Sequence, residues 1–169
     1  MSRCTIRAEA PGDVEVIDAV TQEAFAGAPF SSGTEHLIVK ALRSANALAV
    51  SLVAEAAGCV VGHVAVSPVH VAGKPQAWFG LGPLSVASAH QRRGVGSALV
   101  RAALAQLQAD GAAGCVLLGD PAFYCRFGFV QDSSLVLPGV PAQHFMRLAW
   151  QTPVPAGQVS YHEAFNAAT

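Results

Sequence analysis

Apolar and polar residues alternate over several short runs of the chain, and each run predicts a β-strand. The longest runs cover 48–55, 59–71 and 78–86, and Ala56, Ala57 and Gly58 between the first two predict a hairpin turn. Shorter apolar runs predict one strand near the start of the chain and three in its second half. These further strands cover 3–8, 115–118, 129–137 and 144–150.

Apolar residues spaced three and four apart predict three helices. The first follows Asp13, which we expect to be its N-cap, and a break over 27–33 separates it from a second helix over 34–44. The third begins near Gly94 and ends at Gly111, and 121–126 predicts one helical turn. The resulting order β, α, α, β, β, β, α, β, α, β, β indicates an α/β (α+β) fold, and the tail from Thr152 is expected to lie over the surface.

The composition limits the classes of protein that the chain can belong to. Its 169 residues fit one domain, 1–169, and a hydrophobic share of 52% excludes intrinsic disorder. Ten basic and eleven acidic residues give a net charge of −1, so we expect no nucleic-acid partner. With charged residues at only 12%, part of the surface is left for a subunit interface, and a homodimer is possible.

No segment has the pattern of a membrane span or a signal peptide. The run 56–73 carries no formal charge, but glycines, a proline and histidines interrupt it and its valines alternate as in a strand. A cytoplasmic location is therefore expected. The four cysteines have no metal-binding spacing, so we expect free thiols and no metal.

The low overall charge is unevenly distributed. No Asp or Glu occurs between Glu55 and Asp110, while this interval contains Lys74 and three arginines, which gives it a formal charge of +4. Within it, a predicted strand leads through the turn 91–96 into a helix, and Gly94 and Gly96 leave the backbone N–H groups of that turn accessible. This arrangement predicts a binding site for a phosphate group.

Two common phosphate-binding motifs do not fit this turn. A dinucleotide fingerprint needs a third glycine where Leu99 stands, and a P-loop needs a lysine that the turn lacks. By contrast, Gln91-Arg92-Arg93-Gly94-Val95-Gly96 resembles the [QR]-x-x-G-x-[GA] motif of the GCN5-related N-acetyltransferase (GNAT) superfamily. Tyr124-x-x-x-Gly128-Phe129 is similar to a later segment of the same family, and 118–124 resembles the G-D-P-x-[FY]-Y block of bacterial predicted N-acetyltransferases.

The resemblance implies the GNAT fold, a mixed and mostly antiparallel central sheet flanked by helices, with acetyl-CoA as co-substrate. It also implies that the pantetheine arm pairs with backbone like an added strand and that a main-chain N–H beside Val86 polarises the thioester. Tyr124 would protonate the departing CoA thiolate. The implied cofactor-binding residues are Leu84, Ser85, Val86, Gln91, Arg92, Arg93, Gly94, Val95, Gly96 and Ser97.

A general base is harder to assign, because the interval without carboxylates covers the central strands. His63 and His70 are the remaining titratable candidates there, and we take His63 as the catalytic candidate, against the alternative that it is a packed core histidine. Cys125, next to Tyr124, raises the alternative of an acyl-cysteine intermediate.

These inferences predict an acetyl-CoA-dependent N-acetyltransferase in which a primary amine of a small molecule or peptide attacks the thioester directly. Two alternatives stay open: a catalytically weak module that binds or senses acyl-CoA, and, more distantly, a dinucleotide-binding oxidoreductase. The sequence leaves the acceptor undefined.

Overall fold

The computed structural model describes residues 3–29 and 31–167, and this part of the chain contains four α-helices and ten strands. The helices are α1 (Val14–Phe25), α2 (Glu35–Ser44), α3 (Val95–Ala109) and the single turn α4 (Pro121–Tyr124). The strands are β1 (Thr5–Ala8), β2 (Val50–Ala56), β3 (Cys59–Pro68), β4 (His70–Val71), β5 (Trp78–Val86), β6 (Gly114–Leu118), β7 (Val130–Gln131), β8 (Leu135–Val136), β9 (Phe145–Ala149) and β10 (Gly157–Ser160).

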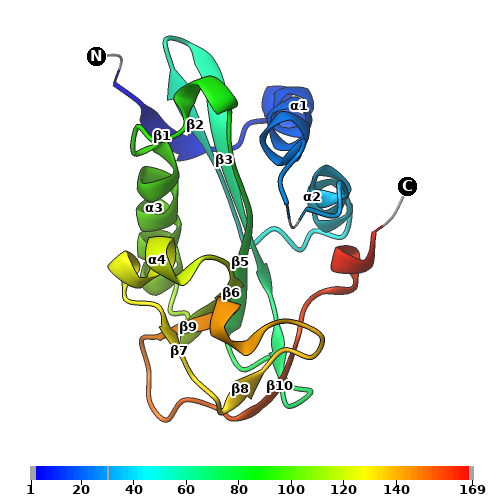
Figure 1. Ribbon diagram of the computed structural model, residues 1–169, viewed down its shortest axis with the longest axis vertical. Helices are drawn as coiled ribbons and strands as arrows, with labels where there is room; N and C mark the ends of the chain where they lie inside the picture. Colours follow the sequence, from blue (N-terminus) through cyan, green and yellow to red (C-terminus); the bar gives the residue numbers. More distant parts are fainter. Residues whose placement is uncertain (1–2, 30, 168–169) are drawn as a thin grey trace.

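Seven strands form the central sheet in the order β1-β2-β3-β5-β6-β9-β7, and every neighbouring pair is antiparallel except β5 with β6. A smaller sheet has the order β4-β10-β8. Helix α3 covers one face of the central sheet, and α1 and α2 cover the other (Figure 1). The predicted mixed, mostly antiparallel sheet between helices is therefore confirmed.

The two helical layers pack on the sheet through separate apolar clusters. On one face, β3 lies so close to α3 that a Cβ added at Gly62 would be 3.1 Å from Leu99 Cδ1. On the other face, Ile17 of α1, Val39 of α2 and Val53 of β2 form a buried cluster. This packing on both faces fixes β2 and β3, and β3 in turn positions its neighbour β5.

Local signals located several elements correctly. Strand β5 has the predicted bounds, and β2 and β3 form the predicted hairpin, in which Ala57 (φ 51°) and Gly58 (φ 79°) take left-handed conformations. Two positive φ angles match the right-handed twist of the paired strands. The predicted break over 27–33 separates α1 from α2, although residue 30 lies outside the described residues.

Two predicted strands were too long. The run 59–71 is divided at Pro68, after which β4 leaves the central sheet and joins the smaller one. The run 129–137 is divided by a turn in which the Asp132 carboxylate accepts hydrogen bonds from the backbone N–H and the hydroxyl of Ser134. Alternation alone carries no information about which sheet a residue joins, and proline and Asx turns interrupt the ladder.

One expectation about the ends of the chain was wrong, and another was confirmed only in position. The tail from Thr152 is not merely draped over the surface, because β10 pairs with both β4 and β8. Asp13 does stand at the N-cap position of α1, but its carboxylate accepts from the N–H of Ala10 and pairs with Arg7 instead of capping the helix.

Candidate active site

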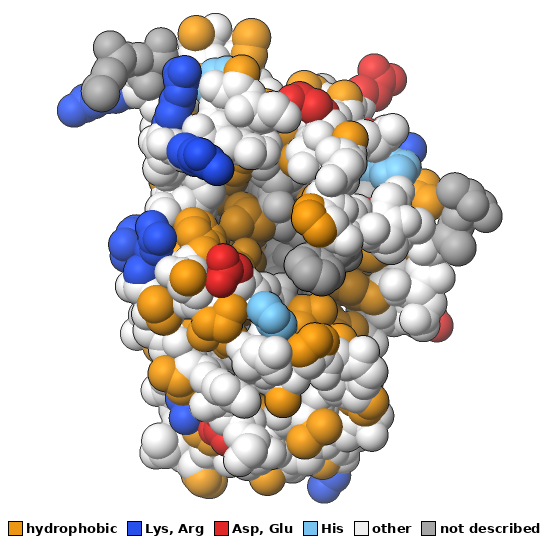
Figure 2. All heavy atoms as spheres, viewed as in Figure 1, with side chains coloured by type: hydrophobic (Ala, Val, Ile, Leu, Met, Phe, Trp, Pro, Cys, Tyr) orange, Lys and Arg blue, Asp and Glu red, His pale blue; other side chains and the backbone are white. Residues whose placement is uncertain are grey.

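The site begins where the two parallel strands of the central sheet separate. Strands β5 and β6 pair only over Trp78–Gly80 and 114–116. Beyond Gly80, β5 pairs with β3 alone, and its other edge is free. A cavity of about 590 Å³ lies at this opening. Figure 2 shows this face of the molecule hollowed between the α3 and α4 side and the α1 and α2 side.

The free edge of β5 presents backbone groups to the opening. The N–H of Ala87 donates to Val61 of β3, whereas the carbonyl of Val86 points the other way and accepts from Gln91 Nε2 at 3.0 Å. Because backbone groups alternate in direction along a strand, the N–H groups of Leu84 and Val86 also point away from β3. Both residues line the cavity. An extended ligand could therefore pair with this edge as an added strand.

The glycine-rich turn closes one end of the cavity. Arg92 (φ 61°) and Gly94 (φ 83°) take left-handed conformations, and Gly94 is the N-cap of α3. The first turn of α3 has no side-chain cap and no acidic residue, so its leading N–H groups are left for an anion. The predicted phosphate site thus has the backbone geometry that an anion requires.

Seven of the ten predicted cofactor residues line this one cavity, namely Leu84, Val86, Gln91, Arg92, Gly94, Gly96 and Ser97. The side chains of the other three point elsewhere. Ser85 is buried and donates to Thr21 Oγ1 at 3.2 Å, and Val95 packs on β3 near Gly62. Arg93 is exposed outside the lining.

Tyr124 also lines the cavity, from the end of α4. Its ring makes edge contacts with Phe123 at 4.8 Å and Phe129 at 6.1 Å between centroids. Gly119 leaves room for the ring, since a Cβ there would lie 2.4 Å from Tyr124 Cε2. Burial raises the pKa of Tyr124 to about 12, with a smaller contribution from Cys115. The hydroxyl is therefore protonated at neutral pH and is able to donate a proton.

Five lining residues were missed by the sequence reasoning: Ala24, Phe25, Asp120, Phe123 and Arg126. The first two come from the end of α1, which only the tertiary structure brings to this place. Asp120 had a local signal, because it precedes Pro121 as the N-cap of α4 and accepts from the N–H of Ala122. The guanidinium of Arg126 lies 4.9 Å from the centre of the Phe123 ring.

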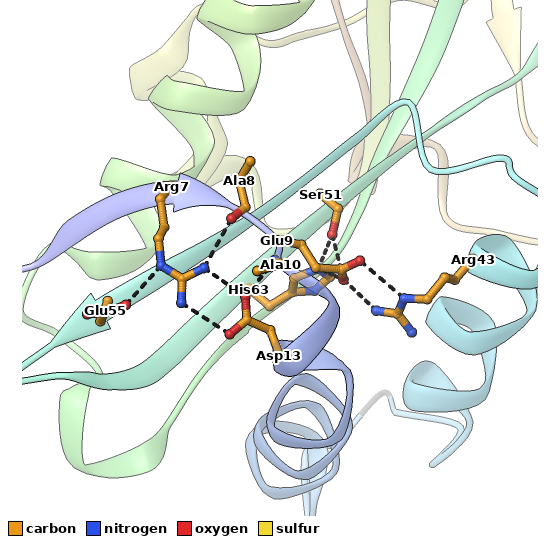
Figure 3. A network of polar contacts seen from close by, with 9 residues as sticks. All are labelled: Arg7, Ala8, Glu9, Ala10, Asp13, Arg43, Ser51, Glu55 and His63. Atoms are coloured by element: carbon orange, nitrogen blue, oxygen red, sulfur yellow. Dashed lines mark hydrogen bonds and ion pairs between the residues drawn. The ribbon is translucent and has the colours of Figure 1, made fainter.

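His63 lies apart from this cavity. Its side chain is fully buried, and its Nε2 is 2.8 Å from Ser51 Oγ, which donates to Glu9 (Figure 3). Glu9 also accepts two hydrogen bonds from Arg43. Burial lowers the pKa of His63 to about 4, partly opposed by Glu9 at 4.0 Å. From the sequence, His63 was the candidate to accept the amine's proton directly or through water, and its full burial outside the cavity lining leaves no direct contact with a bound amine.

The other candidates from the sequence also lie outside the cavity lining. His70 is exposed on β4 in the smaller sheet, and the exposed thiol of Cys125 donates to the carbonyl of Ala122. Within residues 3–29 and 31–167, no group of three or more His, Cys, Asp and Glu side chains is arranged to hold a metal ion. In the same part of the chain, no helix has the length and apolar character needed to span a bilayer.

Comparisons with known proteins agree with this geometry. A family model described as an acetyltransferase (GNAT) domain matches residues 47–131. The uncharacterized N-acetyltransferase YhbS of Escherichia coli K12 is 36% identical over 177 residues, which cover 95% of this chain and 98% of that one. The chain belongs to the GNAT acetyltransferase family. It is therefore an acyl-CoA-dependent acetyltransferase, with acetyl-CoA as its co-substrate.

Solved GNAT structures resemble the whole chain. A GNAT family acetyltransferase from Brucella melitensis in complex with acetyl-CoA has a TM-score of 0.87 and 45% identity, over 98% of this chain and 99% of that one. YhbS from E. coli in complex with CoA has a TM-score of 0.89 and 36% identity, over 99% of this chain and 94% of that one.

The cavity fits the GNAT co-substrate on its own residues. CoA combines a diphosphate with a long amide-containing arm, and the cavity combines the uncapped N-terminus of α3 with the unpaired edge of β5. A Cβ at Gly96 would lie in this cavity, 3.7 Å from both Phe123 Cζ and Val86 Cγ2. The backbone at Gly96 is thus open to a phosphate that a side chain would obstruct.

Proposed function

We propose that this enzyme transfers the acetyl group of acetyl-CoA to a primary amine of a small molecule or peptide by direct attack of the amine on the thioester. The observation that carries the proposal is that three features line one cavity: the glycine-rich turn 91–96 (the anion turn), the free edge of β5 and the side chain of Tyr124. These are the groups that acyl transfer from a CoA thioester requires.

Each group has one role in the proposed reaction. Main-chain N–H groups of 91–97 bind the diphosphate, and the backbone of 84–86 pairs with the pantetheine arm. An N–H of this edge donates to the thioester carbonyl and stabilises the oxyanion as the amine adds. When the tetrahedral intermediate collapses, the C–S bond breaks and Tyr124 donates its proton to the departing thiolate. The amine nitrogen releases one proton to solvent water, and the tyrosinate regains a proton from solvent. Acetyl-CoA supplies the acetyl group. The protein residues bind and orient acetyl-CoA, and Tyr124 donates one proton.

We assign His63 no role in this proton transfer, because its side chain is buried outside the cavity lining and its Nε2 is hydrogen-bonded to Ser51. Its hydrogen bond to Ser51 instead supports a role in holding the connection after β1 against β2 and β3. The single catalytic domain 1–169, the homodimer and the cytoplasmic location stay predictions from the sequence.

Replacement of Tyr124 by Phe tests the proposed acid. We expect the wild-type enzyme to release CoA thiol with acetyl-CoA and an accepted amine from a broad panel, detected by a thiol reagent and by mass spectrometry of products. Tyr124→Phe should lower kcat by about 100-fold or more, the usual contribution of a general acid. Its dissociation constant for acetyl-CoA, measured by calorimetry, should change less than about twofold, because only a proton donor is lost.

Tyr161→Phe is the matched control. Tyr161 is the other tyrosine of the chain, and it packs on Phe165 and against Gly80 outside the cavity lining. An unchanged kcat in Tyr124→Phe would contradict the assigned acid. Tight acetyl-CoA binding with no acetylated product from any amine would favour the sensing module instead.

A further inference from the structure

CoA carries a second anionic group that the anion turn leaves unaccounted for. Besides its diphosphate, it has a phosphate monoester on the 3′ oxygen of its ribose, which holds nearly two negative charges at neutral pH. In the proposed function the N-terminus of α3 binds the diphosphate on one wall of the cavity. A separate cation is needed if the protein is to bind the 3′-phosphate as well.

A neighbouring wall of the cavity supplies such a cation. The wall is formed by Asp120, Phe123, Tyr124 and Arg126, from α4 and the 3₁₀ turn Cys125–Phe127 that follows it. The Arg126 guanidinium lies 4.9 Å from the centre of the Phe123 ring, and its side chain is exposed. Within residues 3–29 and 31–167, no carboxylate pairs with it. Stacking on an aromatic ring orients the planar fork of donors, so less entropy is lost when a phosphate binds.

Two other charged residues line the same cavity, and neither takes this role. Asp120 is negative, and one of its carboxylate oxygens accepts from the N–H of Ala122. Arg92 belongs to the anion turn itself, where its left-handed backbone helps to form the diphosphate site. Arg126 is thus the lining cation that lies outside that turn.

We infer that Arg126 binds the 3′-phosphate of the acyl-CoA and makes the enzyme select acyl-CoA over its 3′-dephospho analogue. This inference rests on the proposed function, because it takes the cavity at β5 and α3 as the co-substrate site. A guanidinium binds a phosphate monoester through two parallel hydrogen bonds, which gives both affinity and geometric selectivity.

Calorimetry with CoA and with 3′-dephospho-CoA tests the inference without an acceptor. We expect the wild-type protein to bind CoA about tenfold or more tightly than dephospho-CoA, as one charge-assisted contact provides. Arg126→Ala should bind CoA about tenfold more weakly and bind dephospho-CoA with unchanged affinity. The ratio of the two affinities should therefore fall to near one. Because Arg126 is exposed, the variant should keep the wild-type melting temperature.

Two matched arginine variants separate the 3′-phosphate from other causes. Arg101→Ala removes an arginine that also lies 4.9 Å from an aromatic ring, Phe127, but outside the cavity lining, and it should leave both affinities unchanged. Arg92→Ala should weaken CoA and dephospho-CoA equally, because both ligands carry the diphosphate.

The outcomes distinguish this inference from the proposed function. Two results would overturn the assignment of Arg126 and leave the co-substrate site in place. One is an Arg126→Ala variant that binds both ligands equally more weakly, and the other is a wild-type protein that binds CoA and dephospho-CoA with equal affinity. A wild-type protein that binds neither ligand would overturn the proposed site together with the inference.

Discussion

Burial of His63 predicts that the folded protein loses stability in mild acid. The pKa of this imidazole falls from an ordinary 6.5 to about 4, chiefly because burial disfavours the charged form. Between these two values the unfolded chain binds a proton that the folded chain rejects. Acid therefore favours the unfolded state, and stability is lost as the pH falls below 6.5.

The size of the effect follows from the two pKa values. At pH 5 the imidazole is nearly fully protonated in the unfolded chain and only about one-tenth protonated in the folded one. Integration from pH 7 to pH 5 gives a loss of about 2 kcal/mol in the free energy of unfolding. This is a sizeable part of the total stability of an ordinary domain.

Urea unfolding, followed by tryptophan fluorescence to which the buried Trp78 contributes, measures this loss at each pH. His63→Gln removes the titrating group while keeping an amide that can hydrogen-bond Ser51. We expect the variant to lose about 2 kcal/mol less than the wild type between pH 7 and pH 5. His70→Gln, which removes an exposed imidazole, should behave as the wild type does. An equal loss in wild type and His63→Gln would refute the reasoning. Glu9, whose burial raises its pKa but whose hydrogen bonds from Arg43 and Ser51 lower it overall, adds an acid loss of its own to both proteins.

Two glycine variants in the anion turn separate binding from stability. Gly96→Ala should weaken CoA binding by about tenfold or more in calorimetry, because the methyl group enters the cavity. Because alanine forms helices better than glycine, the same variant should have a free energy of unfolding that is higher by up to about 1 kcal/mol. Wild-type affinity in this variant would contradict the placement of the diphosphate. Gly94→Ala should instead lower the free energy of unfolding by about 1–2 kcal/mol in urea titrations, because φ is +83° at Gly94 and a Cβ disfavours that conformation. Unchanged stability would contradict this expectation and show that the turn relaxes.

The elements that could be predicted from the sequence are those with local causes. The bounds of β5 follow from alternation between turn residues, and the anion turn follows from Gly94 and Gly96 at the start of an amphipathic helix. The helical turn that carries Tyr124 was also predicted, because its residues lie close together in the chain. Propensity, periodicity and backbone sterics act over a few residues, so a short window of sequence contains them.

The tertiary structure alone decided which of these elements meet. The opening between β5 and β6 depends on where the pairing stops, and the positions of Phe25 and Arg126 on its walls depend on the packing of α1 and α4. His63 illustrates the same limit, since its partner Glu9 comes from a segment more than fifty residues earlier. Burial and contacts between distant segments set the pKa of a histidine and the lining of a cavity. Both quantities arise only when the whole chain has packed.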